Sequence, residues 1–379
     1  MNSTEPQDDD GMGHLPPWQG PAAVFPAPTS GPALLDRYMG CLIGGAIGDA
    51  LGRPVETWPP DQVRLSYPSG LTEFRKWPGW TAGPEGTFTD DTQLSMVVAE
   101  WLIAAGSAAP DGADLAERLC TWLPDARGEG KATRTAVRRL LAGEPWWQAG
   151  TPSAGNGAAM RAAPIGLRFA GQAHDMRHAA MGASIPTHKD WTAVASAIVH
   201  AAAVGLCLST TAEALDPHSF LQLVGQSVSD LQLPAEVLRS DPTVRRTLVD
   251  QIAEVHHWAG RPTREVFDHF FNGAFVLETI PVVLWSLLEY RDDPERALAE
   301  VVMGGRDADT NATMLGNLLG ALHGESVFPQ RWRGSDLESA SIIRDLARNL
   351  YRMRWPESMA SSKTARVQDP PSLLTGPST

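Results

Sequence analysis

Two short acidic segments, residues 88–93 and 304–312, carry the side chains best suited to chemistry. Each places two carboxylates and a hydroxyl directly before an apolar stretch: Thr89, Asp90 and Asp91 in the first, Asp307, Asp309 and Thr310 in the second. Asp and Thr are common helix N-caps, and acids suit the first turn of a helix. Taken singly, each segment is therefore more simply interpreted as a cap than as a metal site.

Together the two segments favour a different interpretation. One capping side chain per helix is enough, and four carboxylates brought into one site would repel one another unless cations lay between them. Hard divalent ions such as Mg²⁺ prefer oxygen ligands. Neither segment contains His or Cys, which disfavours zinc. The segments are far apart in the chain, and their spacing alone does not establish that they meet.

Three further segments contain candidate residues. Gly155-Asn156-Gly157 offers bare backbone N–H groups before a small-residue stretch, which suits a phosphate or sugar, although an ordinary turn is the simpler interpretation. His188 stands at the entry to a long helix, where a histidine is usually structural. Glu56 follows a glycine-rich stretch and by itself reads as a surface carboxylate, while we expect Asp49 to cap or bond locally rather than react.

Helical periodicity extends over nearly the whole chain between its ends. Helices are predicted over residues 34–51, 91–105, 115–123, 132–141, 158–169, 190–208, 243–258, 275–290, 295–303, 308–322 and 337–353. Alternating apolar and polar runs are nearly absent, so no sheet is expected. The pattern predicts one all-α domain over residues 33–355, with a disordered Pro/Gly-rich arm at 1–32 and a disordered tail at 356–379.

Four glycines recur every four residues in the first predicted helix: Gly40, Gly44, Gly48 and Gly52. They share one helical face, and each costs the helix about 1 kcal/mol relative to alanine. Close packing of another helix is the favoured explanation, and backbone lining a ligand site is the alternative. The two explanations are compatible if the end of this helix supports the site.

Composition limits the function classes. The 379-residue chain has a net charge of -13, which argues against binding to a nucleic-acid backbone. Its three cysteines lie in apolar stretches without a metal-binding spacing, which predicts buried free thiols in a reducing, cytoplasmic compartment. The most apolar run, residues 191–208, is Ala-rich and contains His200, so we expect a core helix and no membrane contact. We also expect a monomer.

The order of the motifs resembles the ADP-ribosylglycohydrolase family, from about Tyr38 to Gly324. The resemblance rests on five segments: GCLIGGAIGDALGRPVE (40–56), FTDDTQL (88–94), GNGAAMRAAPIGL (155–167), TH (187–188) and DADTNATMLGNLLGALHG (307–324). Any one of them would be a modest match, whereas all five in this order make a chance match improbable. One departure is Arg306, which stands between Gly305 and Asp307 where many members have a second glycine. We expect it to place a positive charge beside the site.

The resemblance implies a compact orthogonal helical bundle with two Mg²⁺ or Mn²⁺ ions in a central cleft. Carried over position by position, the implied metal ligands are Thr89, Asp90, Asp91, Asp307, Asp309 and Thr310. The implied substrate-binding residues are Gly155, Asn156, Gly157, Met160 and His188. The carboxylate that takes the proton of the attacking water is Glu56 or Asp91, and the sequence does not rank them.

The implied activity is removal of ADP-ribose from a modified protein side chain, with an arginine N-glycosidic linkage preferred. Hydrolysis of small ADP-ribose conjugates or of O-linked (serine or acetyl) ADP-ribose is a first alternative, because the ADP-ribose half is shared. A non-catalytic protein that binds ADP-ribose or a toxin is a second. Retention of all six implied metal ligands argues against the second alternative.

Overall fold

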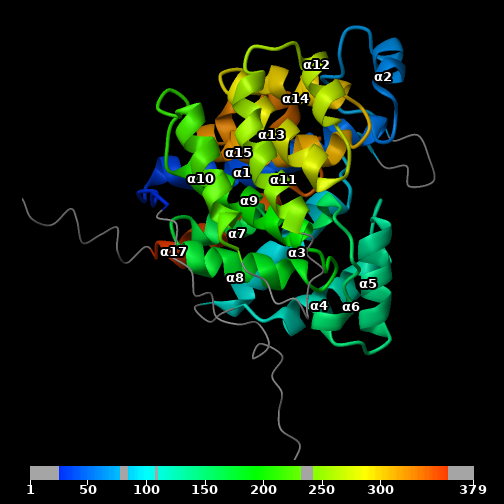
Figure 1. Ribbon diagram of the computed structural model, residues 1–379, viewed down its shortest axis with the longest axis vertical. Helices are drawn as coiled ribbons and strands as arrows, with labels where there is room; N and C mark the ends of the chain where they lie inside the picture. The colour runs from blue at the N-terminus through cyan, green and yellow to red at the C-terminus, as the bar shows by residue number, and fades with distance from the viewer. Residues whose placement is uncertain (1–24, 77–83, 107–109, 232–241, 357–379) are drawn as a thin grey trace, which may run out of the picture.

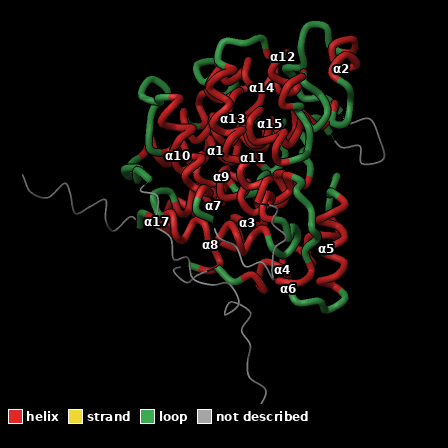
Figure 2. The backbone as a smooth tube through the Cα atoms, in the orientation of Figure 1, coloured by secondary structure: helices red, strands yellow, loops and turns green. Residues whose placement is uncertain are grey.

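The computed structural model describes residues 25–76, 84–106, 110–231 and 242–356, without the side chains of 242–246. Helices form nearly all of its regular structure (Figures 1 and 2). In the described ranges there is no strand, only two isolated bridges that pair Thr151 with His188 and Gly155 with Phe275. The predicted all-α class is confirmed.

The helices follow one another through short loops. The α-helices are α1 (Pro32–Gly52), α2 (Pro60–Ser66), α3 (Asp90–Ala105), α4 (Gly112–Trp122), α5 (Lys131–Leu141), α6 (Trp146–Ala149), α7 (Ala163–Phe169), α8 (Ala173–Ser184), α9 (Trp191–Leu208), α10 (Pro217–Ser229), α11 (Pro242–Glu254), α12 (Thr263–Phe270), α13 (Val276–Tyr290), α14 (Pro294–Met303), α15 (Ala308–His323), α16 (Gln330–Arg333) and α17 (Ala340–Arg354). The 3-10 turns are η1 (Arg53–Val55), η2 (Leu123–Asp125), η3 (Asn156–Ala158), η4 (Val255–Trp258) and η5 (Glu325–Val327).

The pairing of α1 with α15 is the central contact of the fold, and the glycine stripe explains it. A methyl group on Gly44 would collide with the backbone of Gly316, and one on Gly48 with the backbone of Ala312. Gly40 and Gly52 meet the two ends of α15 in the same way. Close packing, the favoured explanation of the stripe, is therefore confirmed. Because the contact continues to Gly52, the C-terminal end of α1 lies against the residues that begin α15.

Helix α9 lies in the interior and packs against α7, α8, α10 and α15. The Asp190 carboxylate caps its start by accepting from the backbone N–H groups of Thr192 and Ala193. By length and composition α9 could cross a membrane, but all 18 of its residues are buried inside the fold. The prediction of a core helix is confirmed.

The structure corrects several predicted boundaries. The helix predicted over residues 158–169 begins at Ala163, because Pro164 cannot donate a hydrogen bond and fits only the first turn. The chain before it forms the turn η3 and an irregular stretch. Helices α2, α6, α8, α10, α12 and α16 were not predicted. Four of them (α2, α6, α12 and α16) have eight residues or fewer, too short for a clear period. In α8 and α10 small and polar residues weaken the apolar pattern, although Asp216-Pro217 is a regular helix-start signal for α10.

The N-terminal arm predicted over residues 1–32 also needs correction at its end. Phe25 is buried in the core, and Ser209 Oγ donates a 2.8 Å hydrogen bond to Pro26 O. Ala27 packs so close to Gly171 that a Cβ atom on this glycine would lie 2.9 Å from Ala27 Cβ. The folded domain therefore includes the chain from Phe25 onward. Residues 1–24 and most of the predicted tail (357–379) lie outside the described residues.

Candidate active site

The two acidic segments meet at one pocket of about 330 Å³. Five acids line what we call the acidic wall: Glu56, Asp90, Asp91, Asp307 and Asp309. A second set of residues, the neutral wall, lines the same pocket: Gly155, Asn156, Gly157, Met160 and His188. Thr310 also lines it, and Thr89 is buried next to Asp90. The fold thus brings together residues separated by more than half the chain.

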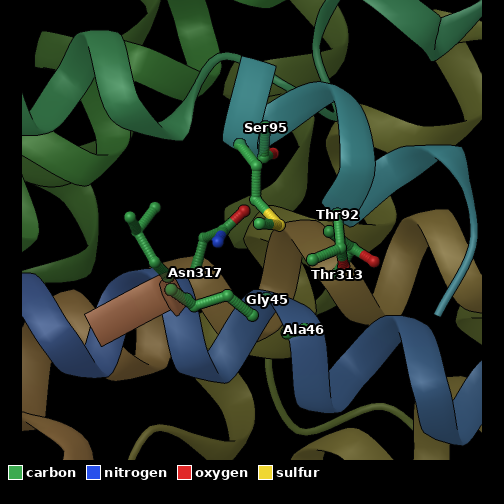
Figure 3. A pocket seen from close by; sticks show the side chains of 9 residues that line it. Gly45, Ala46, Thr92, Ser95, Thr313 and Asn317 are labelled. Atoms are coloured by element: carbon green, nitrogen blue, oxygen red, sulfur yellow. The ribbon is translucent and has the colours of Figure 1, made fainter. Parts of the chain in front are cut away.

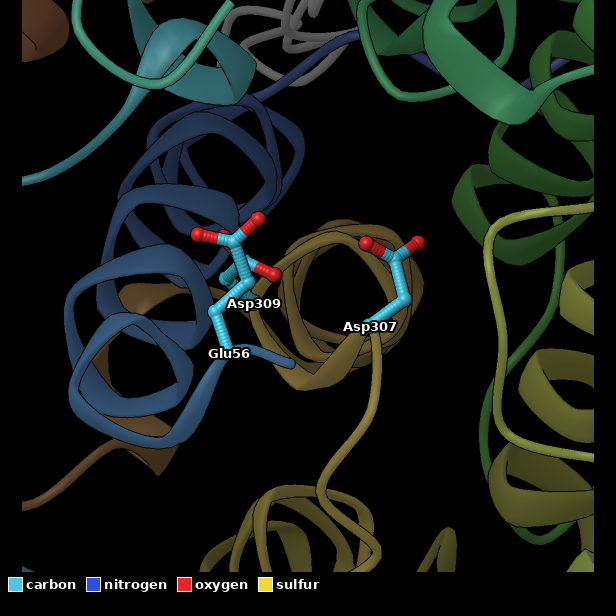
Figure 4. Close-up of side chains that lie close together, drawn as sticks. All are labelled: Glu56, Asp307 and Asp309. Carbon is cyan, nitrogen blue, oxygen red and sulfur yellow. The ribbon is translucent and has the colours of Figure 1, made fainter. Parts of the chain in front are cut away.

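Glu56, Asp307 and Asp309 form the tightest group of acids. Each offers one carboxylate oxygen, and the three oxygens lie within 4.8 Å of one another. Figure 4 shows Glu56 and Asp309 side by side, with Asp307 approaching from across the start of α15. Glu56 comes from the loop after η1, so the group joins the C-terminal end of the α1 segment to the start of α15.

Backbone contacts fix this meeting point. Gly52 packs against the backbone of Ala308 and Asp309, where a side chain would not fit. Beyond it, Arg306 N–H donates to Trp58 O (2.8 Å) and Thr57 N–H donates to Arg306 O (2.5 Å). Thr57 and Arg306 both adopt positive φ angles, 66° and 60°, which non-glycine residues rarely adopt. The strained pair adjoins Glu56 and Asp307 directly and holds the two loops in register.

The Asp49 side chain binds the start of α3, 40 residues away, rather than a neighbouring backbone group. Its Oδ1 accepts from the backbone N–H of Thr89 (2.9 Å), and its Oδ2 accepts from the backbone N–H and the hydroxyl of Thr92 (3.0 and 2.7 Å). Asp49 is fully buried in α1. It therefore ties the start of α3, and with it Asp90 and Asp91, to the helix that also positions Glu56.

The capping interpretation of the acidic segments fails for most of their carboxylates. Thr89 caps α3 by accepting from the backbone N–H of Asp91, which leaves the carboxylates of Asp90 and Asp91 uncommitted to capping. Asp307 stands at the N-cap of α15 but makes no side-chain capping bond. Its Oδ2 instead accepts from Asn156 Nδ2 at 2.6 Å. The acids are therefore placed for something other than helix termination.

Electrostatics make this cluster unfavourable without a counter-charge. Burial, followed by repulsion from Asp307 and Asp49, raises the pKa of Glu56 to about 7. Burial raises the pKa of Asp307 to about 6 against the hydrogen bond from Asn156. For Asp309, burial and the charges of Glu56 and Asp307 raise the pKa well above its ordinary value. The same two causes, burial and neighbouring carboxylates, raise the pKa values of Asp90 and Asp91.

Unpartnered oxygens indicate what would relieve the cluster. Asp91 Oδ1 and Asp309 Oδ1 are buried and have no hydrogen-bond partner in the described chain. A buried polar atom without a partner costs about 1–3 kcal/mol or more, and two such carboxylate oxygens beside three further acids fit a bound cation. The donor set is all oxygen, which suits Mg²⁺ or Mn²⁺ rather than zinc. The acidic wall could therefore hold a divalent metal ion.

In the neutral wall, Asn156 is held by other residues of the chain. Asn156 Nδ2 donates to Asp307 Oδ2 and to Thr279 Oγ1 (2.9 Å), and Asn156 N–H donates to Ala274 O (3.0 Å). Both side-chain protons of Asn156, predicted as a substrate contact, are thus used to position an acid and to bind α13. Sequence reasoning did not foresee this role.

His188 lines the pocket beside Gly157 and is 3% exposed. A Cβ atom on Gly157 would lie 2.8 Å from His188 Cε1, so glycine is required for the ring to approach this loop. Met160 completes the same wall. The structure therefore brings all five predicted substrate-binding residues to one pocket with the acids.

Arg306, which we expected to place a positive charge beside the site, is not among the residues that line the pocket. Its guanidinium lies 3.7 Å from the ring centroid of Phe271, and its Nη1 donates to Phe267 O at 3.3 Å. Its contribution to the site is made by the backbone bonds to residues 57 and 58.

Sequence reasoning missed one edge of the pocket, the loop before α5. Gly128, Gly130 and Lys131 line the pocket, as does Thr133 in the first turn of α5. Lys131 is the one cationic side chain among the lining residues. Two glycines directly before a helix are the signal that could have found this loop.

A second hollow lies between α1, α3, α15 and α17 (Figure 3). Its lining includes Gly45, Thr92, Ser95 and Asn317, and its volume is about 10 Å³. That volume holds about one water molecule, far less than a nucleotide needs. This hollow is therefore too small for a nucleotide-sized substrate, whereas the pocket lined by the acids has a volume of about 330 Å³.

Comparison with known proteins places this pocket in a family context. The family model described as ADP-ribosylglycohydrolase matches residues 30–358. The ADP-ribosylhydrolase ARH3 of Homo sapiens is 30% identical over 84% of this chain and 94% of its own length. The ADP-ribosyl-[dinitrogen reductase] glycohydrolase of Rhodospirillum rubrum is 27% identical over 80% of this chain and 91% of its own.

Solved structures agree with these relatives. A chain described as an ADP-ribosylglycohydrolase-related protein complex superposes with a TM-score of 0.65 at 30% identity, covering 85% of this chain and 99% of its own. The match by family model, by sequence and by structure spans the helices that form both walls of the pocket. The chain therefore belongs to the ADP-ribosylglycohydrolase family, a family of hydrolases.

Proposed function

We propose that this protein removes ADP-ribose from modified protein side chains, preferentially from arginine, with two Mg²⁺ or Mn²⁺ ions held by Thr89, Asp90, Asp91, Asp307, Asp309 and Thr310. The observation that carries the proposal is the convergence of five carboxylates, two with unpartnered buried oxygens, on a pocket that also contains the neutral wall. When bound there, the ions would supply the positive charge that neutralises the acids, holds ribose hydroxyls and lowers the pKa of a nearby water molecule.

Glu56 is the stronger candidate for the base that takes the proton from water. Its side chain is half-buried, so solvent reaches it, whereas Asp91 is 2% exposed and its Oδ2 already accepts from Thr89 Oγ1 (3.1 Å). Burial of Glu56 also raises its pKa, which makes its carboxylate a better proton acceptor than an exposed glutamate. Water then attacks the anomeric carbon, the bond to the side chain breaks, and its nitrogen leaves with the electron pair.

The neutral wall is suited to the ADP-ribose half of the substrate. Backbone N–H groups and an uncharged imidazole can bind phosphate or sugar oxygens without the cost of burying a further charge. Glu56, the one pocket-lining acid not assigned to a metal ion, can pair with a guanidinium leaving group. A relative from Serratia proteamaculans, 26% identical over 92% of this chain, is named ADP-ribosylarginine hydrolase Tri1. These points favour the arginine linkage.

The test is release of free ADP-ribose from matched arginine-linked and serine-linked ADP-ribosyl peptides, with Mg²⁺ and with a chelator. We expect Mg²⁺-dependent release from the arginine peptide. Glu56→Gln should reduce kcat by about 100- to 10,000-fold, whereas Glu100→Gln, an exposed acid further along α3, should leave it unchanged.

Other outcomes would redirect the proposal. Release from the serine peptide alone would mean that the enzyme cleaves the serine linkage instead of the arginine linkage. The reaction class would stay the same. Tight binding of ADP-ribose with no release from either peptide would point to small ADP-ribose conjugates or to a binding protein. Release that is unaffected by the chelator would overturn the metal assignment.

A further inference from the structure

We propose that Arg161 and Thr187 are positioning residues that fix His188 in the tautomer with its proton on Nε2. In this form the ring offers one N–H donor to an oxygen of the bound ligand. The identity of that ligand rests on the proposed function, whereas the tautomer does not. Two features carry the inference: a buried chain of hydrogen bonds, and the position of the ring in the pocket.

The chain begins at Arg161, which is fully buried. Its Nη2 donates to Ala183 O at 2.8 Å and to Thr187 Oγ1 at 2.5 Å. A guanidinium has five N–H donors and no acceptor. The direction of the second bond is therefore fixed: Thr187 accepts from Arg161, and its own hydroxyl proton must go elsewhere.

Two acceptors lie within reach of that proton. His188 Nδ1 is 2.8 Å from Thr187 Oγ1, and Ser184 O is 3.3 Å away. Ser184 O already accepts from the backbone N–H of Thr187 (3.1 Å) and from that of His188 (2.8 Å). Because a carbonyl oxygen has two lone pairs, these bonds fill it. His188 Nδ1 is the closer acceptor and still has its lone pair free, so the Thr187 hydroxyl donates to it.

An imidazole that accepts at Nδ1 carries its proton on Nε2 when it is neutral. His188 is neutral, because burial and then the positive charge of Arg161 lower its pKa to about 3. The ring therefore has one donor, at Nε2, and no acceptor left.

That donor faces the pocket. A Cβ atom on Gly157 would lie 3.1 Å from His188 Nε2 and 3.7 Å from Thr133 Oγ1, and all three residues line the pocket. A ligand group seated here must accept a hydrogen bond. A phosphate or ribose oxygen can do so, and an ammonium or guanidinium cannot. The relay thus helps to distinguish the ADP-ribose half from a cationic leaving group.

Nitrogen-15 NMR of the histidine side chains tests the tautomer directly. The His188 signals are identified by their loss in His188→Gln. We expect wild-type protein to show a protonated Nε2 and a bare Nδ1, without any ligand present. Thr187→Val should abolish the hydrogen-bonded Nδ1 shift, and Thr187→Ser, which keeps the hydroxyl, should restore it. A wild-type ring protonated on Nδ1, or on both nitrogens at neutral pH, would overturn the proposal.

Calorimetric titration with free ADP-ribose tests the consequence for binding. Thr187→Val should weaken ADP-ribose binding about tenfold, and Thr187→Ser should lie within about twofold of wild type. Mg²⁺ affinity should be the same in all three proteins. Equal losses in the valine and serine variants would show a packing effect and overturn the relay. If wild-type protein does not bind ADP-ribose at all while the NMR result is as expected, the proposed function fails and the relay stands.

Discussion

The two walls of the pocket differ in where their polar groups find partners. On the acidic wall, Asp91 and Asp309 each keep a buried oxygen without a partner. On the neutral wall, the side chains of Asn156 and His188 are held by other residues of the chain. The first wall needs a cation to complete it, whereas the second is positioned by the protein alone and keeps one donor, His188 Nε2, for a ligand. Removing the cation should therefore disturb one wall and leave the other in place.

The largest expected effect comes from a single acid. Asp309→Asn keeps the shape of the side chain and removes the charge that binds the cation, so turnover should fall about 1,000-fold or more and Mg²⁺ affinity should fall with it. The measurements are kcat and a calorimetric Mg²⁺ titration. Asp345→Asn, an exposed acid on α17, is the matched control. Full activity of Asp309→Asn with unchanged Mg²⁺ binding would remove the acidic wall from the mechanism.

Asn156 links the two walls, and its loss should have a smaller effect. Asn156→Ala removes the donor that holds Asp307 and should weaken Mg²⁺ binding about 10- to 100-fold, the range found when the partner of a metal ligand is deleted. Asn349→Ala, exposed on α17, should not alter it. If Asn156→Ala changed ADP-ribose binding alone, Asn156 would belong to the neutral wall only.

The packing of α1 against α15 positions the acidic wall, and a substitution in this contact tests that role. Gly48→Ala should destabilise the fold by about 1–3 kcal/mol, because the added methyl group meets the backbone of α15. It should also weaken Mg²⁺ binding, since the contact sets Glu56 against Asp309. Gly182→Ala in α8, where the nearest atoms lie 3.7 Å away, should be neutral or stabilising. Thermal unfolding and a Mg²⁺ titration measure both effects. A melting temperature for Gly48→Ala equal to that of wild type would contradict the packing argument.

The smallest effect is a dependence of stability on pH. Folding raises the pKa of Glu56 to about 7 from an ordinary 4.5, and that of Asp307 to about 6 from 3.8. Between the ordinary and the raised pKa of each of these two groups, the folded chain binds more protons than the unfolded chain. These two groups therefore lower the free energy of unfolding as the pH rises. Buried His188 and His200, whose pKa values are lowered to about 3 and about 4, give the opposite slope, so the contribution of the acids is read from the gap in melting temperature between a series with Mg²⁺ and a series with a chelator. That gap should widen from pH 5 to pH 8.

Saturating Mg²⁺ should offset the loss of stability that the acids cause, because the cation binds the ionised acids. The comparison of the two thermal series isolates the acidic wall, since the chelator and Mg²⁺ do not act on the buried groups of the neutral wall. A gap in melting temperature between the two series that does not widen from pH 5 to pH 8 would show that the acids are not mutually repelling in the folded state.

Local patterns were sufficient for much of the fold. The helices over α1, α3, α9, α13, α14 and α15 were predicted to within a residue or two, because their apolar spacing and start signals are strong. Prediction failed where a proline or a polar composition hid the pattern, as in α7 and α8. Packing against α9 then stabilises helices whose own sequence only weakly favours them.

The sequence by itself determined which chemical groups are available. It has two acidic segments whose possible metal ligands are all oxygen atoms, a glycine stripe in the first helix, and a glycine-rich loop before a small-residue stretch. Only the tertiary structure decided their partners. Asp49 binds a helix start 40 residues away, Asn156 holds an acid, and the guanidinium of Arg306 lies over Phe271. The physical reason is that spacing fixes which face of a helix a residue occupies, whereas hydrogen bonding and charge depend on which other segment packs there.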